Sequence, residues 1–300
     1  MIRGERMDQH HHGAELRRME RKDLQAVLDL INTEGWDYHI SEMDRILDVD
    51  PENSVVTCSG GSIVGAITIA VSGKRAVLAH VVVKGGWRNK GIGQMMMGHL
   101  AQKMDSIGVE TMEAYAVPAA VPFYKRHGYH NVEEIDTYDK ILTAKDVAGV
   151  PMGEKIRPLG KEDLDAICRL DRTVTGFDRK NILRQLAGDF PGMAKGLFDG
   201  GEMTGYFLSR VNPIMNDLGP WAMAEPDFDD GSMMLRSTLR EMKPGTRVLG
   251  GVAMNNAVVR EIFLSLGFKA VHKAFRMVRS KGGTEPFRPG MMTLSAFEFG

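Results

Sequence analysis

The chain contains two related halves, and this internal repeat limits its fold more than any other feature of the sequence. The segment LRRMERKDLQAVLDL from Leu16 matches IRPLGKEDLDAICRL from Ile156, at an offset of 140 residues. GSIVGAITI from Gly61 matches GEMTGYFLS from Gly201 at the same offset, and FYKRHGY later matches IFLSLGF at an offset of 139. Three matches at nearly one offset predict two copies of one fold.

Each half has the order of elements expected of an α/β (α+β) unit. A short strand leads to an amphipathic helix, whose apolar residues over 24–31 recur at i, i+3, i+4 and i+7. A hairpin turns at SGGS or DGGE and leads to a strand and a helix that begins with glycines. A further strand, a short helix and a closing strand complete the half. We therefore predict a mixed, mostly antiparallel sheet flanked by helices in each copy.

The repeat also sets the predicted domain boundaries, which are a polar tail over 1–14, domains over 15–145 and 155–280, a linker over 146–154 and a C-terminal extension over 281–300. The three histidines in the tail, residues 10–12, fit a polar segment better than a metal site. The final MMTLSAFEFG alternates like a strand, with residues 292, 294, 296 and 298 on one face. This strand could dock on either half or on a second copy of the chain, so a homodimer stays open.

Composition excludes several classes of function. The 300 residues carry 38 Lys plus Arg against 39 Asp plus Glu, so no global field favours nucleic acid or an anionic membrane. The cysteines, Cys58 and Cys168, have neither disulfide nor metal-site spacing. No apolar run approaches the ~20 residues that span a bilayer, and the N-terminus lacks the core of a signal peptide. We expect a cytoplasmic protein without a metal.

The segment WRNKGIGQMMMGHL predicts an anion site. Gly91 and Gly93 follow an apolar strand over 77–83 and precede a helix whose stripe contains Met95, Met96, Leu100 and Met104. The first N–H groups of a helix have no intrahelical partner and lie at the positive end of its dipole. A P-loop is excluded because no Lys-Ser/Thr follows, and a dinucleotide fingerprint because methionine replaces its third glycine.

The pattern Arg88-x-x-Gly91-x-Gly93 resembles the pyrophosphate loop of the GNAT superfamily of acyl-CoA-dependent N-acyltransferases. VPFYKRHGY, about thirty residues downstream, is similar to the second cofactor segment of that family, in which a Tyr precedes a Gly-aromatic pair. The resemblance covers 15–145 well and 155–280 in outline. It implies two tandem GNAT domains and acetyl-CoA as the cofactor.

The resemblance also implies which residues hold the cofactor. Main-chain amides after Arg88 would hold the diphosphate, and one strand would pair with the pantetheine arm as a peptide pairs with a sheet edge. The diphosphate residues are Asn89, Lys90, Gly91, Ile92, Gly93 and Gln94, and the strand residues are Val81, Val82 and Val83.

Acyl transfer requires a neutral amine as nucleophile and a proton for the departing thiolate. The resemblance gives the proton-donor role to Tyr124; simple packing is the alternative. The base is His80 or Glu113, and His80 is the better candidate by its unperturbed pKa, although a buried structural histidine explains His80 better than a catalytic one. Trp36 and Tyr38 lie where the family shapes its acceptor pocket, and core packing is again the alternative. A strand amide could hold the oxyanion.

The second copy looks catalytically silent. At offset 140 Gly231 faces Gly91 and Met233 faces Gly93, and DFDD replaces WRNK, which puts two carboxylates at a phosphate site. At offset 139 Phe263 replaces the proposed donor.

A further difference concerns Val117. Family members often carry an Asn there that touches the cofactor, and here the Asn is found only in the second copy, as Asn256.

We therefore predict an N-acetyltransferase that holds one acetyl-CoA per chain, in its N-terminal half, and transfers acetyl directly to an amine of a small molecule or peptide. The alternative is an acyl-CoA sensor that binds cofactor without transfer.

Overall fold

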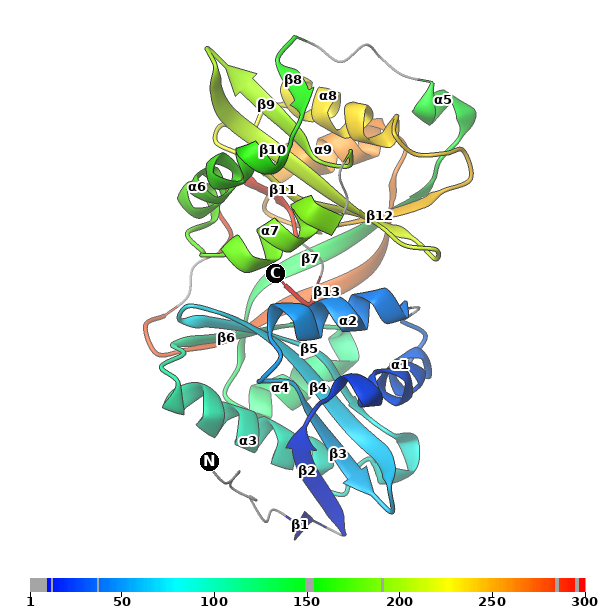
Figure 1. Ribbon diagram of the computed structural model, residues 1–300, viewed down its shortest axis with the longest axis vertical. Coiled ribbons are helices and arrows are strands. Elements are labelled where there is room, and N and C mark those ends of the chain that lie inside the picture. The colour runs from blue at the N-terminus through cyan, green and yellow to red at the C-terminus, as the bar shows by residue number, and fades with distance from the viewer. Residues whose placement is uncertain are drawn as a thin grey trace. The chain divides into compact units, whose positions relative to one another are not determined.

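The computed structural model describes residues 10–11, 13–36, 38–148, 154–189, 192–283, 286–294 and 297–299. The chain divides into two compact units, Met1–Glu113 and Ala114–Gly300 (Figure 1). Both are mixed α/β, as predicted. Within the described residues, no helix has the length and apolar character needed to cross a membrane.

Unit 1 is built from the first five strands of the chain and the helices packed on them. Its elements are β1 (His10–His11), β2 (Ala14–Arg18), η1 (Arg21–Asp23), α1 (Leu24–Asn32), α2 (Ile40–Val49), β3 (Val55–Ser59), β4 (Ser62–Ser72), β5 (Arg75–Val83), η2 (Gly85–Trp87) and α3 (Ile92–Ser106). The strand β6 (Thr111–Ala116) begins here and ends in unit 2.

The strands β2 to β5 of unit 1 form an antiparallel meander. Residues 64–70 of β4 are buried without interruption, which means that both faces of this strand are covered. The helices α1, α2 and α3 all pack on β4. A Cβ on Gly65 would lie 3.0 Å from Met96 Cε and 3.2 Å from Ile92 Cγ2, so glycine lets the start of α3 approach the sheet closely.

The buried stripe of α3 differs from the predicted one at one position. Met96, Leu100 and Met104 are buried as predicted, but Met97 takes the place given to Met95. The helix begins at Ile92, so its inward face also includes that residue.

Both copies begin with the same ion pair, which supports the duplication at the level of local structure. Arg17 donates to both Asp23 oxygens at 2.6 and 2.7 Å, and Arg157 donates to Asp163 at 2.9 and 2.7 Å. Each aspartate also accepts the main-chain N–H three residues earlier, which starts the turn before the first long helix.

Unit 2 holds the end of the first copy and all of the second. Its elements are η3 (Pro118–Ala120), α4 (Val121–Arg126), β7 (His130–Ile141), α5 (Ala144–Val147), β8 (Ile156–Pro158), η4 (Lys161–Asp163), α6 (Leu164–Thr175), α7 (Lys180–Asp189), β9 (Lys195–Asp199), β10 (Glu202–Val211), β11 (Asn216–Met223), α8 (Phe228–Leu239), β12 (Arg247–Ala253), α9 (Ala257–Ser265), β13 (Lys269–Ser280) and β14 (Met291–Thr293).

The closing strands of the two copies are neighbours in unit 2. Its strand order is β13-β7-β12-β11-β10-β9-β8, with β14 paired to β11 (Figure 1). The first copy's closing strand, β7, runs antiparallel to β12 from Ile141↔Arg247 to Ile135↔Ala253, and antiparallel to β13 on its other side. The closing strand of the first copy therefore completes a sheet built from the second.

The ends of the chain follow the predictions in part. His10 and His11, expected in the tail, pair with β2 as β1; residues 1–9 and 12 lie outside the described residues, as do 149–153 of the expected linker. The C-terminal extension does form a strand, over Met291–Thr293, and that strand docks on the second copy. Residues 295, 296 and 300 of the predicted strand lie outside the described residues.

Candidate active site

A β-bulge shapes the middle of β5. Ala66 pairs with Val82 and Thr68 pairs with Ala79, so His80 and Val81 together face a single residue of β4. His80 has a positive φ of 48°, which is uncommon for a residue with a side chain. Bulges re-aim side chains and interrupt the ladder next to functional sites. This one includes Val81, the first of the strand residues expected to pair with the pantetheine arm.

The bulge directs His80 toward the residues of the expected acceptor pocket. Its imidazole is buried, and Nδ1 lies 2.7 Å from Thr68 Oγ1. The Tyr38 ring meets it edge-on at 4.3 Å between centroids, and Trp36 lies at 6.4 Å. The structure thus brings together His80, Tyr38 and Trp36, which the sequence singled out separately. Thr68 was not anticipated, because nothing in a strand sequence indicates which hydroxyl faces the neighbouring strand.

Glu113 has a different environment. Both of its carboxylate oxygens accept hydrogen bonds at 2.9 Å from Arg75, one from Nε and one from a terminal nitrogen. Arg75 is buried and Glu113 is fully buried. A carboxylate held bidentately by a guanidinium favours the ionised, structural form over proton acceptance from a substrate. The geometry therefore favours His80 as the base.

The glycine turn after β5 leads directly into α3. Trp87 N–H donates to Lys84 O and Arg88 N–H to Gly85 O, which closes the short turn η2. Asn89 has a φ of 61°, and Gly91, the N-cap of α3, has a φ of 76°. Left-handed residues here curl the chain so that successive N–H groups can point to one side, and glycine adopts this conformation at no steric cost.

The side chain of Arg88 is turned back toward the protein. Its Nε donates to Val83 O at 2.9 Å, and its guanidinium forms an ion pair with Glu34. Arg88 therefore fixes the end of β5 relative to the segment that carries Trp36 and Tyr38. Lys90 lies over the Trp87 ring, 5.0 Å from its centroid, so Arg88 and Lys90 both contact protein groups.

Tyr124 lies on α4, in unit 2. It is buried, and its ring makes edge contacts at 5.5 Å with Phe123 and with Tyr129. Burial raises the pKa of the Tyr124 phenol well above its usual range. The hydroxyl is protonated at neutral pH, as that of an ordinary tyrosine is, and its burial makes it a weaker acid.

Comparison with known proteins identifies the family. Two profiles, both described as acetyltransferase (GNAT) domains, match residues 20–145 and 167–287 and together span most of the chain. The chain belongs to the GNAT acetyltransferase family. It carries two such domains in tandem.

Several solved structures share this fold. A putative acetyltransferase from Pyrococcus horikoshii matches with a TM-score of 0.81 and 16% identity over 100% of both chains. A tandem GNAT protein of the clavulanic acid biosynthesis pathway matches at 0.65 and 18%, covering 91% of this chain and 100% of its own. Saccharomyces cerevisiae N-myristoyltransferase with bound myristoyl-CoA matches at 0.63 and 14%, covering 93% and 83%. A search of curated protein sequences gave no match.

The second GNAT domain starts its corresponding helix differently from the prediction. The N-cap of α8 is Asp227, and three residues separate it from the end of β11, whereas seven residues separate the end of β5 from Gly91. Gly231 is therefore not the structural counterpart of Gly91. It lies inside α8, where a Cβ would come 2.6 Å from Ile262 Cδ1. Met233 likewise does not fill the turn, because it packs against the unit 2 core from within the helix.

Asp227 occupies the position that an anion would take at this helix. Its carboxylate accepts the N–H groups of Asp229 and Asp230 at 2.9 and 3.0 Å. The second GNAT domain thus satisfies its own helix N-terminus with a side chain, while the N-cap of α3 is a glycine without one. This difference was missed because a fixed offset of 140 hides the shorter loop.

The second domain keeps the bulge without the chemistry. Phe207 pairs with Trp221 and Ser209 with Leu218, which leaves Gly219 and Pro220 at the bulge of β11. Proline has neither a main-chain N–H nor a titratable side chain. Phe263, the counterpart of Tyr124, is fully buried against Phe268 and cannot donate a proton.

Proposed function

We propose that the first GNAT domain binds acetyl-CoA with its diphosphate at the N-terminus of α3. The observation that carries this proposal is the left-handed turn at Asn89 and Gly91, which follows β5 and leads into a 15-residue helix. The amides of residues 89–94 would hold the diphosphate, and the main chain of 81–83 the pantetheine arm. A neighbour in fold solved with bound myristoyl-CoA supports the choice of an acyl-CoA.

We propose further that the domain transfers the acetyl group directly to an amine. His80 would accept the amine proton, because its ring faces Tyr38 and Trp36, aromatic residues suited to wall an acceptor pocket. The hydroxyl of Thr68, 2.7 Å from Nδ1, would hold the ring in one orientation. The acceptor is a small-molecule or peptide amine.

Tyr124 would return a proton to the departing thiolate. Burial raises the pKa of the phenol, so it stays protonated through the physiological range but is a weaker acid than a free tyrosine; the donor role rests on the family resemblance and not on this shift. Membership of an acyltransferase family favours this reaction over an acyl-CoA sensor without turnover.

Calorimetry with coenzyme A tests the cofactor site. Gly91→Asp should abolish binding, because a side chain strains the left-handed N-cap and its charge opposes the diphosphate. Gly98→Asp is the matched control: it adds the same charge to an exposed position of α3 where a Cβ meets nothing within 4 Å. Equal affinity of the Gly91→Asp variant and wild type would refute the site.

A further inference from the structure

The strands β11 and β12 of unit 2 are parallel neighbours for only a short distance. They pair at Asn216↔Val248 and Asp217↔Leu249. Further along β11, its partner is β14, through Trp221↔Thr293 and Ala222↔Met291. The C-terminal extension therefore enters the space where β11 and β12 diverge, which we call the β11–β12 cleft.

Residues 289–294 bridge the two sides of this cleft with main-chain hydrogen bonds. Met223 N–H of β11 donates to Gly290 O at 2.9 Å, and Leu294 N–H donates to Gly251 O of β12 at 3.0 Å. Residues 291–294 are all buried, between 0% and 4% exposed. An extended chain paired in this way is β-augmentation within one polypeptide.

Glycines make room for the segment on both sides. A Cβ on Gly219 would lie 2.0 Å from Leu294 O, and one on Gly251 would lie 3.3 Å from Leu294 Cδ1. On the segment itself, a Cβ on Gly290 would lie 2.4 Å from Met223 O and 2.6 Å from Val174 Cγ1. The fit depends on backbone approaching backbone, as in a cleft that holds an extended ligand.

The side chain of Asn256 holds the segment by hydrogen bonds. Its Nδ2 donates to Pro289 O at 2.8 Å and to Met291 O at 3.2 Å, while its Oδ1 accepts Val259 N–H and caps α9. This is the asparagine that the family resemblance associates with cofactor contact, and Val117 stands at its place in the first copy. In the second copy it holds peptide carbonyls.

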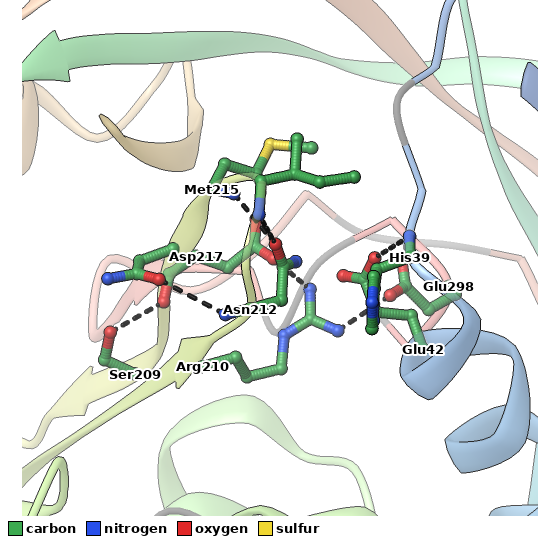
Figure 2. Close-up of polar contacts among 10 residues, drawn as sticks. His39, Glu42, Ser209, Arg210, Asn212, Met215, Asp217 and Glu298 are labelled. Carbon is green, nitrogen blue, oxygen red and sulfur yellow. Dashed lines mark hydrogen bonds and ion pairs between the residues drawn. The ribbon is translucent and has the colours of Figure 1, made fainter. Parts of the chain in front are cut away.

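The segment is anchored beyond both ends of the cleft. On one side Phe287 N–H donates to Glu133 at 3.1 Å, and the Phe287 ring lies under the Arg276 guanidinium at 4.0 Å. On the other side Glu298 forms a buried ion pair with Arg210 at 2.8 Å, and Asp217 contacts the same arginine at 2.5 Å (Figure 2).

We propose that the β11–β12 cleft is a peptide-binding site, with residues 289–294 of the same chain as its ligand. The segment lies along β11 at the position that corresponds to residues 81–83 of β5 in the first domain. There, the pantetheine arm would lie along β5, and this comparison rests on the function proposed for the first domain. The segment leaves the cleft as a unit while the surrounding sheet stays folded, and the vacated cleft accepts an extended peptide. Acyl-CoA is excluded there, because Asp227 already caps the amides that a diphosphate would need.

Gly290→Ala in the full chain tests this proposal, because the added methyl displaces the segment and leaves the cleft unchanged. Gly282→Ala is the control, since a Cβ there meets nothing within 4 Å. Peroxide oxidation followed by mass spectrometry should show Met291 and Met292 reacting roughly 10- to 100-fold faster in Gly290→Ala. Met234, fully buried in the core, should keep its wild-type rate.

A second variant guards against a general folding defect. Asn256→Asp keeps an oxygen to cap α9 but replaces the donor to Pro289 O and Met291 O. Asn212→Asp, in a turn where Asn212 Oδ1 accepts two N–H groups, adds the same charge as a control (Figure 2). If Met234 oxidises in step with Met291 in both Gly290→Ala and Asn256→Asp, the segment is an inseparable part of the core and the proposal fails.

Binding in trans completes the test. A labelled synthetic peptide of residues 286–294 should bind Gly290→Ala at one per chain and bind neither wild type nor Gly282→Ala. The same peptide carrying alanine at position 290 should not bind. If the peptide of wild-type sequence does not bind the Gly290→Ala protein, or if coenzyme A displaces it, the assignment of the cleft as a peptide-binding site is overturned. Peptide binding without any coenzyme A binding would instead refute only the function proposed for the first domain.

Discussion

An irregularity of the backbone, the bulge in β5, determines where the His80 side chain lies. The role of His80 can therefore be tested by a substitution that leaves the strand intact. It lies at the β5 bulge with a positive φ, and Thr68 contacts its Nδ1. Asparagine tolerates this conformation well and can also hydrogen-bond, but it does not titrate near neutral pH. His80→Asn is therefore the substitution that removes the base with the least change to the fold.

We expect His80→Asn to lower kcat by roughly 10²–10⁴-fold. The kcat with a chosen amine, compared between wild type and the variant, measures this effect. His130→Asn, at an exposed position of β7, controls for loss of a histidine. A wild-type kcat in His80→Asn would make His80 a structural residue.

Tyr124→Phe separates a proton donor from a packing residue. The ring contacts with Phe123 and Tyr129 do not require the hydroxyl, so coenzyme A affinity should be nearly unchanged. Turnover should fall by roughly 10²–10⁴-fold if the phenol protonates the thiolate. Single-turnover kinetics and calorimetry on the same variant measure the two quantities. Wild-type turnover in the chemical step would leave Tyr124 with packing alone.

At the scale of single residues, the sequence predicted the position of the glycine turn better than it predicted which side chains contact one another. Gly91 could be placed at a helix N-terminus because a strand, two glycines and an amphipathic pattern lie within one short segment. The partners of Glu113 and His80 could not be predicted. Arg75 lies 38 residues from Glu113 and Thr68 lies 12 residues from His80, and strand register decides both contacts.

At the scale of elements, the helices and hairpins followed from periodicity, while their exact starts did not. The loop before α8 is shorter than the loop before α3. A fixed offset therefore aligned Gly231 with Gly91, although the N-cap that corresponds to Gly91 is Asp227. The helix starts where Asp227 can cap it, and this signal was present in the sequence as an aspartate before the acidic DD pair. Where the two disagree, the position of a capping residue indicates the start of a helix better than the sequence offset does.

The sequence likewise could not predict which strands pair with the closing strands of the two copies. β7 and β13 are both 12-residue strands, and each copy was expected to close with its own. In unit 2, β7 lies between β12 and β13. Alternating strands of equal length satisfy either neighbour equally well, so local pattern does not determine which sheet a strand completes.

At the scale of the whole molecule, the sequence repeat and the compact units have different boundaries. The first sequence copy ends and the second begins near residue 150, whereas the two compact units divide between Glu113 and Ala114. The last three residues of β6, together with α4 and β7, belong to the first copy by sequence and to unit 2 by contact. The proposed donor Tyr124 is in this part.

The two copies should differ in cofactor stoichiometry, and titration of the intact chain with coenzyme A tests this. We expect one site per chain in wild type and none in Gly91→Asp. In the second copy Asp227 caps α8, Pro220 removes an N–H at the bulge and residues 289–294 fill the β11–β12 cleft. Because these obstacles are independent, Asp227→Gly should still bind one coenzyme A. Two equivalent sites in wild type would contradict a silent second copy, and a second site in Asp227→Gly would show that the cap alone had closed it.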